Sequence, residues 1–408
     1  MNELVAGIDL CEEYTQVNCG EEEKTWIFPT VLCLHKTAEI WSVGEDAYAH
    51  ALKGEGSLMD KLISLVLKDG SATLNGKCYT GKELLEEFLG CVLKTVKKEN
   101  GPDSGFTQLT FTVRKLDRRL EEVLFSCGKK LGVDTARIRV ISHPESFLYY
   151  ILSQKKELWS GTVGMFDLAA EELRYYELKV QRGLQKHAVL VEYEKIEECV
   201  NLDLLDTPSG AKLGDQILCA CAERVMQRKL YSAVFLMGKG FEKREWAENF
   251  MKLLCTKRRV YMENAVFAKG AAYCGADRLR PQTSYPYAMI CEGRLKTSVS
   301  MTLLHKGQES SVTLISAGDN WQDAKVQLTV IPEKQNAVEF EIQPFETKKK
   351  RVVTVMLDGF PVRPDRTTKV RINLTFLDEK TMEVLLTDLG FGELFPASGI
   401  QIRQEVTL

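Results

Sequence analysis

Short apolar runs alternate with helical stripes over the first two thirds of the chain. The runs LVAGIDLC, QLTFTV, IRVISHP, VGMFDL and SAVFLMGKG predict buried strands, and the alternating segments YTQVNCG and LRYYELKV predict hairpin partners for two of them. In TGKELLEEFLGCVLKTVKKEN the apolar residues recur at helical spacing, and Thr80 with Glu83 forms a capping box at its start. Asn75-Gly76 predicts a hairpin before this helix. This alternation, which continues to about residue 277, predicts a mixed α/β architecture.

The pattern changes near residue 278. The segment RLRPQTSYPY has two prolines and no periodicity, which predicts a linker over residues 278–296. From residue 297 to residue 408, apolar and polar residues alternate in short segments such as AKVQLTVI, AVEFEIQPF and KVRINLTFLD. This spacing predicts an all-β sandwich. We therefore expect one lobe over residues 1–160, a second lobe over residues 161–277, the linker, and the sandwich.

Composition narrows the class of function. The net charge of -3 and the pI near 6.1 argue against nucleic acid or a membrane surface as a partner. The segment MNELVAGIDL does not read as a signal sequence, and no apolar run approaches the ~20 residues that a membrane helix needs. The 12 cysteines include no CxxC pair, and the 5 histidines are scattered without metal-ligand spacing. Reduced thiols in a cytoplasmic protein are expected.

The order of the segments resembles that of a known family. GIDLCEEYTQV and VGMFDL look like two phosphate-binding strands, AVFLMGKGFEKREW like an adenosine strand and turn, and LDGFPVRPDRTTKVRINLTFLDEKTMEVLLTDLG like a peptide-binding β-domain. Together they resemble the seventy-kilodalton heat-shock (DnaK-like) chaperones of the actin-like ATPase superfamily. The resemblance implies an α/β fold, a shortened two-lobed actin-like (ribonuclease-H-like) ATPase, followed by an all-β sandwich domain.

The resemblance also implies a nucleotide site. In that family ATP binds between the two lobes, and its hydrolysis is coupled to a β-sandwich that grips extended peptide. Asp9 and Asp167 match the two acids that position the metal and the attacking water. The implied cleft comprises Gly7, Asp9, Cys11, Glu12, Glu13, Arg114, Asp167, Ala169, Ala170, Glu171, Glu172, Gly238, Lys239 and Gly240.

Both phosphate turns depart from the family pattern. Glycine and small hydroxylated residues are expected there, but the chain has Cys11, Glu12 and Glu13 in the first turn and Ala169, Ala170, Glu171 and Glu172 in the second. Arg114 replaces a proline, and His143 occupies the position of a glutamate associated with catalysis. From the resemblance we expect the second lobe to lack the subdomain that covers the adenine, and the β-domain to lack the family's helical lid.

These departures oppose a bound triphosphate. A carboxylate about 4 Å from a phosphate charge costs about 4 kcal/mol at an effective dielectric near ~20, which is about three decades of affinity. Alanine does not favour the left-handed backbone that a phosphate turn often needs. Three interpretations of the glutamates stay open. They could be solvated acids that replaced the original residues once phosphate contact no longer mattered. They could form ion pairs with Arg114 and Lys239 that take the place of phosphate and metal in the cleft. They could also be metal ligands beside Asp9 and Asp167.

The resemblance and the departures together predict a chaperone-like pseudo-ATPase. It would bind protein or extended peptide and would need neither nucleotide nor metal. One alternative is a magnesium-dependent ATPase, in which Asp9 and Asp167 would hold Mg²⁺ during phosphoryl transfer from ATP. Another is an actin-like filament or scaffold subunit. Fold alone does not decide among these three functions.

Overall fold

The chain divides into two compact units. The structure, a computed structural model, describes residues 2–20, 24–101, 104–170, 172–181, 187–198, 200–256, 258–305, 307–333, 336–347 and 349–408. The first unit comprises Met1–Val180 and Val191–Pro286, and the second comprises Gln181–Leu190 and Tyr287–Leu408. Each unit is described by itself below.

A five-stranded sheet lies at the centre of the first lobe of the first unit. Its strands follow the order β10 (Ile138–Ser142), β9 (Ser104–Val113), β1 (Asn2–Leu10), β2 (Tyr14–Cys19) and β3 (Thr25–Pro29). The strands β1, β2 and β3 are antiparallel neighbours, whereas β9 and β10 run parallel to β1.

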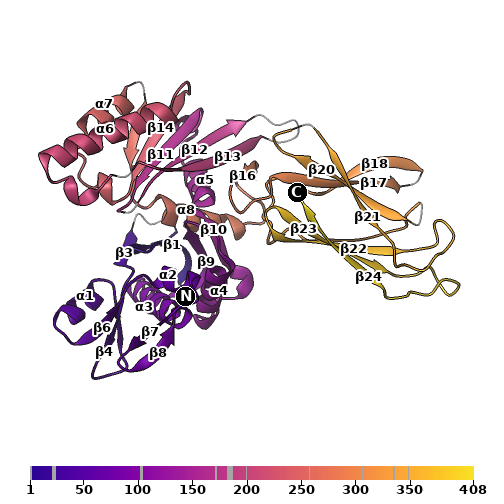
Figure 1. Cartoon of the computed structure of the whole chain (residues 1–408), viewed down its shortest axis with the longest axis horizontal. Coiled ribbons are helices and arrows are strands. Elements are labelled where there is room, and N and C mark those ends of the chain that lie inside the picture. The colour runs from indigo at the N-terminus through magenta and orange to yellow at the C-terminus, as the bar shows by residue number, and fades with distance from the viewer. Residues whose placement is uncertain are drawn as a thin grey trace. The chain divides into compact units, whose positions relative to one another are not determined.

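The second lobe repeats this sheet (Figure 1). Its strands follow the order β15 (Arg259–Met262), β14 (Tyr231–Met237), β11 (Thr162–Leu168), β12 (Leu173–Gln181) and β13 (Ala188–Ile196). Again β12 is antiparallel to β11, and β14 and β15 run parallel to it. Each of these five strands therefore has a counterpart in the first lobe, and a sixth strand, β16 (Ala288–Ile290), pairs with β13 at the edge of this sheet. The duplicated strand order is the two-lobed, ribonuclease-H-like arrangement that the sequence predicted.

Helices connect the strands at matching places in the two lobes. The helices α3 (Gly81–Glu99) and α6 (Pro208–Val225) precede β9 and β14, and α4 (Arg118–Lys130) and α7 (Glu248–Cys255) follow them. The capping box predicted at the start of α3 is present. A strand, a helix and a parallel strand form a right-handed crossover that covers one face of the sheet, so the sequence alternation leads directly to this layered fold.

The first lobe has further elements between β3 and α3. They include the hairpin of β7 (Ser71–Leu74) and β8 (Lys77–Thr80), in which Asn75 and Gly76 have φ angles of 49° and 80°. Positive φ at both central residues is the reason why Asn-Gly favours this turn, and the prediction is confirmed. The remaining elements are β4 (Leu32–His35), β5 (Trp41–Val43), α1 (Glu45–Leu52), β6 (Gly56–Met59) and α2 (Leu62–Leu67).

Two helices are exchanged between the lobes. The helix α5 (His143–Ser153) follows the last strand of the first sheet, yet Tyr150 packs edge-on against Phe235 of β14, with ring centroids 5.8 Å apart. The helix α8 (Val266–Arg278) follows the last strand of the second sheet and packs on β1 and β9 of the first. Figure 1 shows both helices between the two sheets.

Small residues allow α8 to approach its neighbours closely. A Cβ atom on Gly270 would lie 1.9 Å from the carbonyl oxygen of Ser146 in α5, and one on Gly7 of β1 would lie 2.1 Å from that of Ala268. The Ser146 hydroxyl also donates a hydrogen bond to the carbonyl oxygen of Phe267, at 2.6 Å. The small residues of α8 therefore allow its backbone to lie directly against the backbones of α5 and β1.

The second unit contains two four-stranded antiparallel sheets. One has the order β18 (Gln308–Ile315), β17 (Thr297–His305), β20 (Ala337–Pro344) and β21 (Arg351–Met356). The other has the order β19 (Val326–Val330), β22 (Val370–Asp378), β23 (Thr381–Asp388) and β24 (Gln401–Thr407). Their inner faces share one hydrophobic cluster that includes Phe340 and Ile372. This arrangement is the predicted all-β sandwich.

Seven of the strands were not predicted from the sequence: β3, β4, β5, β6, β13, β16 and β24. The strand β24 buries few of its residues, and β13 has three charged residues in its second half, so neither shows a strong apolar signal. The predicted linker over residues 278–296 contains the short strand β16 (Ala288–Ile290), which pairs in parallel with the start of β13. Within the described residues, none of the helices combines the length and the apolar composition required for a membrane span.

Candidate functional site

Two equivalent turns form the candidate site. The first turn joins β1 to β2, the second joins β11 to β12, and Asp9 and Asp167 are the second-last residues of the strands that precede them. Both aspartates are buried, with 0% and 2% of the residue exposed. Electrostatic interactions connect them with the neighbouring charged and polar groups. We call this group the paired-turn site and define it as Asp9, Cys11, Arg114, His143, Asp167 and Glu172.

Both turns close on themselves through the same hydrogen bond. The backbone N–H of Cys11 donates to the carbonyl oxygen of Tyr14 at 3.1 Å, and that of Ala169 donates to Glu172 at 3.0 Å. None of the described turn residues has a positive φ; Glu171 is outside the described part of the chain. A phosphate cradle needs successive amides that point into one concavity. The first amide of each turn is instead used within the turn.

The carboxylate of Glu172 is bound by three cations. Its oxygens lie 2.6 Å from Nη1 of Arg114, 2.8 Å from Nε of Arg174 and 3.1 Å from Nζ of Lys195. Arg114 follows β9 of the first lobe, whereas Arg174 and Lys195 lie on β12 and β13 of the second. Burial raises the pKa of Glu172, but Arg114 and Arg174 outweigh burial and hold it below its ordinary value. Glu172 therefore stays ionised and connects the lobes.

Other residues of the predicted cleft have different roles. The carboxylate of Glu12 accepts hydrogen bonds from the backbone N–H of Ser64, at 3.1 and 3.3 Å, in the first turn of α2. A carboxylate there stabilises a helix N-terminus, so Glu12 has a role within the fold, and its place beside a phosphate stays a prediction. Lys239 is exposed, and in the described part of the chain no ion pair joins it to the turn glutamates. Glu13 is half-buried beside Glu12. Glu171 lies outside the described residues.

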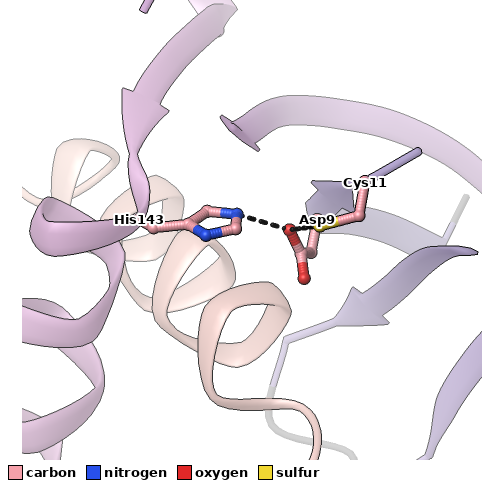
Figure 2. Close-up of side chains that lie close together, drawn as sticks. All are labelled: Asp9, Cys11 and His143. Atoms are coloured by element: carbon pink, nitrogen blue, oxygen red, sulfur yellow. Dashed lines mark hydrogen bonds and ion pairs between the residues drawn. The ribbon is translucent and has the colours of Figure 1, made fainter. Parts of the chain in front are cut away.

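A second group gathers around Asp9 (Figure 2). The Nε2 atom of His143 lies 2.8 Å from Oδ1 of Asp9, and the Cys11 thiol donates to the same oxygen at 3.6 Å. His143 is the first residue of α5, and its ring stacks on Phe267 of α8 with centroids 3.8 Å apart. Burial lowers the pKa of His143, against the opposing effect of Asp9, and so favours the neutral ring.

This group brings together three residues that can ligate a metal ion, although the histidines show no metal-ligand spacing along the chain. The ligating atoms of Asp9, Cys11 and His143 all lie within 4.8 Å of one another. Spacing along the chain could not reveal the group, because His143 is 134 positions from Asp9. The two-residue interval between Asp9 and Cys11 was the one local signal.

Asp167 lies on the other side of the paired-turn site. Burial raises its pKa to about 7, although Arg114 opposes the shift, and Asp9 adds to it. Among the described residues its Oδ1 atom has no hydrogen-bond partner. Asp167 is therefore a carboxyl group that changes charge near neutral pH.

The glycines assigned to the cleft allow close packing. Gly238 has a φ of 98°, and a Cβ atom there would lie 2.5 Å from the carbonyl oxygen of Leu168. A Cβ atom on Gly240 would lie 2.3 Å from the side chain of Leu168. Gly7 faces α8, as described above. Each glycine has a packing reason that is independent of a ligand.

Comparison with known families assigns both parts of the chain. The sequence model described as "Family of unknown function (DUF5716) C-terminal" matches residues 13–292, more than half of the chain. The chain belongs to this family. A second model, described as "Domain of unknown function (DUF8552)", matches residues 294–408. The first match covers most of both lobes and includes Arg114, His143, Asp167 and Glu172, whereas Asp9 and Cys11 lie just before it.

Searches beyond the family models give less. A search of curated proteins finds no significant match. Among solved structures, the chain is similar to a non-polymerising mutant of MamK bound to AMPPNP, at 14% identity and a TM-score of 0.40. The match covers 67% of this chain and 99% of that one.

The residues of the paired-turn site do not fit a triphosphate. Its turns use their first amides internally, and the described turn residues avoid the left-handed backbone of a cradle. An anionic ligand would also have to displace Glu172 from Arg114. The site instead offers an ionised carboxylate bound by cations, a carboxyl group that titrates near neutral pH, and a buried group of oxygen, sulfur and nitrogen atoms.

Proposed function

We propose that the chain is a pseudo-ATPase that works as a protein-binding module. In this proposal an actin-like first unit no longer uses ATP or magnesium, and the all-β second unit binds protein or extended peptide. Kinship with the heat-shock chaperones and a cytoplasmic location belong to the same proposal. It rests on the resemblance in sequence and on the state of the paired-turn site.

One observation carries the proposal. Glu172 occupies the cations that an anionic ligand would need, and it connects Arg114 of the first lobe with Arg174 and Lys195 of the second. The side chains of Arg114 and Glu172 are 25% and 9% exposed, so water screens this pair less than it screens a surface pair. Removing one partner of such a pair costs about 2–4 kcal/mol. The lobes are thus held together by the chain itself.

Nucleotide calorimetry tests the proposal. Titration of the full chain with ATP and Mg²⁺ should give no binding heat, and the melting temperature should not rise with nucleotide, because ligand binding stabilises a fold by mass action. Micromolar affinity that is lost in Asp9→Ala would establish the ATPase alternative instead. An array of extended apolar peptides should contain sequences that bind the chain without nucleotide, and an array without any binder would count against the module.

A charge exchange tests the link between the lobes. Arg114→Glu and Glu172→Arg should each lower the free energy of unfolding by about 2–4 kcal/mol. The double variant should recover part of this loss, since the two charges attract again. Urea unfolding measures all three variants. A double variant that is as unstable as the sum of the single variants would contradict the link.

The matched control is an exposed pair. Lys252 and Glu248 lie on α7 at 2.6 Å, with 68% and 71% of their side chains exposed. Exchanging these two charges should change stability by less than about 1 kcal/mol. A larger loss of stability at Arg114 and Glu172 than at Lys252 and Glu248 would show that the link between the lobes matters, and not charge exchange in general.

One observation favours each of the two alternatives, the magnesium-dependent ATPase and the filament or scaffold subunit. Oδ2 of Asp9 and Oδ1 of Asp167 have no hydrogen-bond partners among the described residues, which is a feature that a magnesium-dependent ATPase would use. The duplicated fold is shared with actin-like proteins that polymerise, which favours a filament or scaffold subunit. Sedimentation velocity over a range of concentrations separates a filament subunit from a monomeric module.

A further inference from the structure

We infer that Asp9, Cys11 and His143 form a binding site for a borderline-soft divalent metal ion, with Zn²⁺ as the expected occupant. The three side chains offer oxygen, sulfur and nitrogen, and their ligating atoms lie within 4.8 Å of one another. They come from the end of β1, the turn after it and the start of α5 (Figure 2). This inference goes beyond the proposed function and does not depend on it.

Burial makes this group different from a chance surface cluster. Only 0%, 3% and 0% of Asp9, Cys11 and His143 are exposed. A buried carboxylate is costly unless its oxygens are bound. Yet Oδ2 of Asp9 and Nδ1 of His143 have no hydrogen-bond partners among the described residues. A divalent cation at this point would give the carboxylate the partner that it lacks.

The distances suit a tetrahedral ion. Zinc binds sulfur at about 2.3 Å and nitrogen or oxygen at about 2.0–2.2 Å, so its ligands lie about 3.3–3.6 Å apart. Sγ of Cys11 is 3.6 Å from Oδ1 of Asp9, which already matches. Nε2 of His143 is 2.8 Å from the same oxygen, so the hydrogen bond would open by about half an ångström to admit the ion.

The ligand set selects the metal. Magnesium requires oxygen ligands in octahedral geometry, whereas a thiolate and an imidazole favour zinc. The thiolate and the carboxylate together neutralise the two charges of the ion. Coordination releases the Cys11 proton to solvent, and the His143 ring stays neutral because its proton moves from Nε2 to Nδ1. A water molecule would fill the fourth position.

The surroundings hold the ligands in place. The ring of His143 is stacked on Phe267 at an interplanar angle of 19°, and Ser142 caps the helix that carries it. Arg114, which interacts electrostatically with Cys11 and His143, is already paired with Glu172, so its charge is balanced. The ion would therefore join β1 and α5 without meeting an unpaired positive charge.

Cobalt spectroscopy tests the site on the full chain. Titration of the purified, reduced, metal-free protein with Co²⁺ should give one equivalent of a tetrahedral d–d spectrum and a thiolate-to-cobalt charge-transfer band. Zn²⁺ should abolish both, and excess Mg²⁺ should not. Cys11→Ser should remove the charge-transfer band, and His143→Ala should weaken Co²⁺ binding at least about 100-fold. Cys33→Ser, at a buried cysteine of β4 outside the cluster, should change neither.

The wild-type spectrum makes the inference falsifiable even where a variant does not fold. Absence of the charge-transfer band in folded wild-type protein would overturn it. A band that persists in Cys11→Ser, or that disappears in Cys33→Ser, would place the metal elsewhere and overturn it as well. Because this readout contains no nucleotide, its failure is distinguishable from failure of the proposed function.

Discussion

At the scale of single residues, two carboxyl groups of the paired-turn site show how strongly the surroundings of a carboxyl group set its pKa. Glu172 is surrounded by three cations, which outweigh the effect of burial and keep it ionised. Asp167 is buried beside another acid, and the larger of its two compensating charges, Arg114, is shared with Glu172. The same chemical group therefore connects the lobes in one position and takes up a proton in the other.

The raised pKa of Asp167 predicts a pH-dependent stability. Its pKa is about 7 in the folded chain against an ordinary value of 3.8, so the unfolded chain loses this proton first as pH rises. Stability contributed by protonated Asp167 is therefore lost between about pH 4 and pH 7, by about 2–3 kcal/mol from pH 5 to pH 8. In Asp167→Asn this loss should be absent in urea unfolding.

A control isolates the buried carboxyl group. Asp60→Asn removes an exposed acid of the first lobe and should leave the pH dependence unchanged. If wild type and Asp167→Asn lose the same stability between pH 5 and pH 8, the proton is not held by Asp167.

At the scale of elements, the contact between α5 and α8 depends on the absence of a side chain. Gly270 lies so close to α5 that a methyl group would overlap the carbonyl oxygen of Ser146. Neither helix can yield alone, because α5 also packs on the second sheet and α8 on the first. A single methyl group added at Gly270 should therefore disturb the contact between α5 and α8.

Gly270→Ala should destabilise the first unit by about 3 kcal/mol, since overpacking against backbone cannot be relieved by a rotamer change. For a unit of this size the melting temperature should fall by roughly 6–12 °C. Gly90→Ala is the matched control, because nothing lies within 4 Å of the added methyl group in α3. That change should be neutral or stabilising by up to about 1 kcal/mol. Equal effects of the two substitutions in thermal unfolding would refute the packing argument.

At the scale of the whole molecule, each unit has its own core. Separate hydrophobic clusters fill the lobes of the first unit and the sandwich of the second. In the sandwich, buried Asp388 is bound by Arg363 at 2.7 and 2.8 Å and by Ser398. Burial raises the pKa of Asp388, but Arg363 and Ser398 outweigh it and hold it well below its ordinary value. The stability that ionised Asp388 contributes to the sandwich is therefore present above about pH 4 and is lost as pH falls further.

Calorimetry should detect the two cores separately. Two unfolding transitions are expected at neutral pH. Arg363→Ala leaves Asp388 buried and unpaired, so it should cost about 3–5 kcal/mol and lower one transition by roughly 10 °C. The other transition should stay in place, and Gly270→Ala should have the converse effect. A single transition that both variants shift equally would contradict two separate cores.

Local signals in the sequence were sufficient for much of this fold. Asn75-Gly76 and the capping box at Thr80 act over a few residues, and both are found where the sequence predicted them. Asp9 and Asp167 could be placed at equivalent strand ends by their apolar runs. Contacts over long intervals could not be predicted, because nothing local records them. Glu12 reaches Ser64 across 52 positions.

The exchange of α5 and α8 has a consequence for any attempt to divide the chain. A stop codon after residue 160 would retain all five strands of the first sheet but delete the helix that lies against β1 and β9. The fragment would expose an apolar surface that the intact protein never shows to solvent, and aggregation is its expected fate. Because each lobe contributes a helix that packs against the other, we expect neither lobe to fold stably when the two are separated.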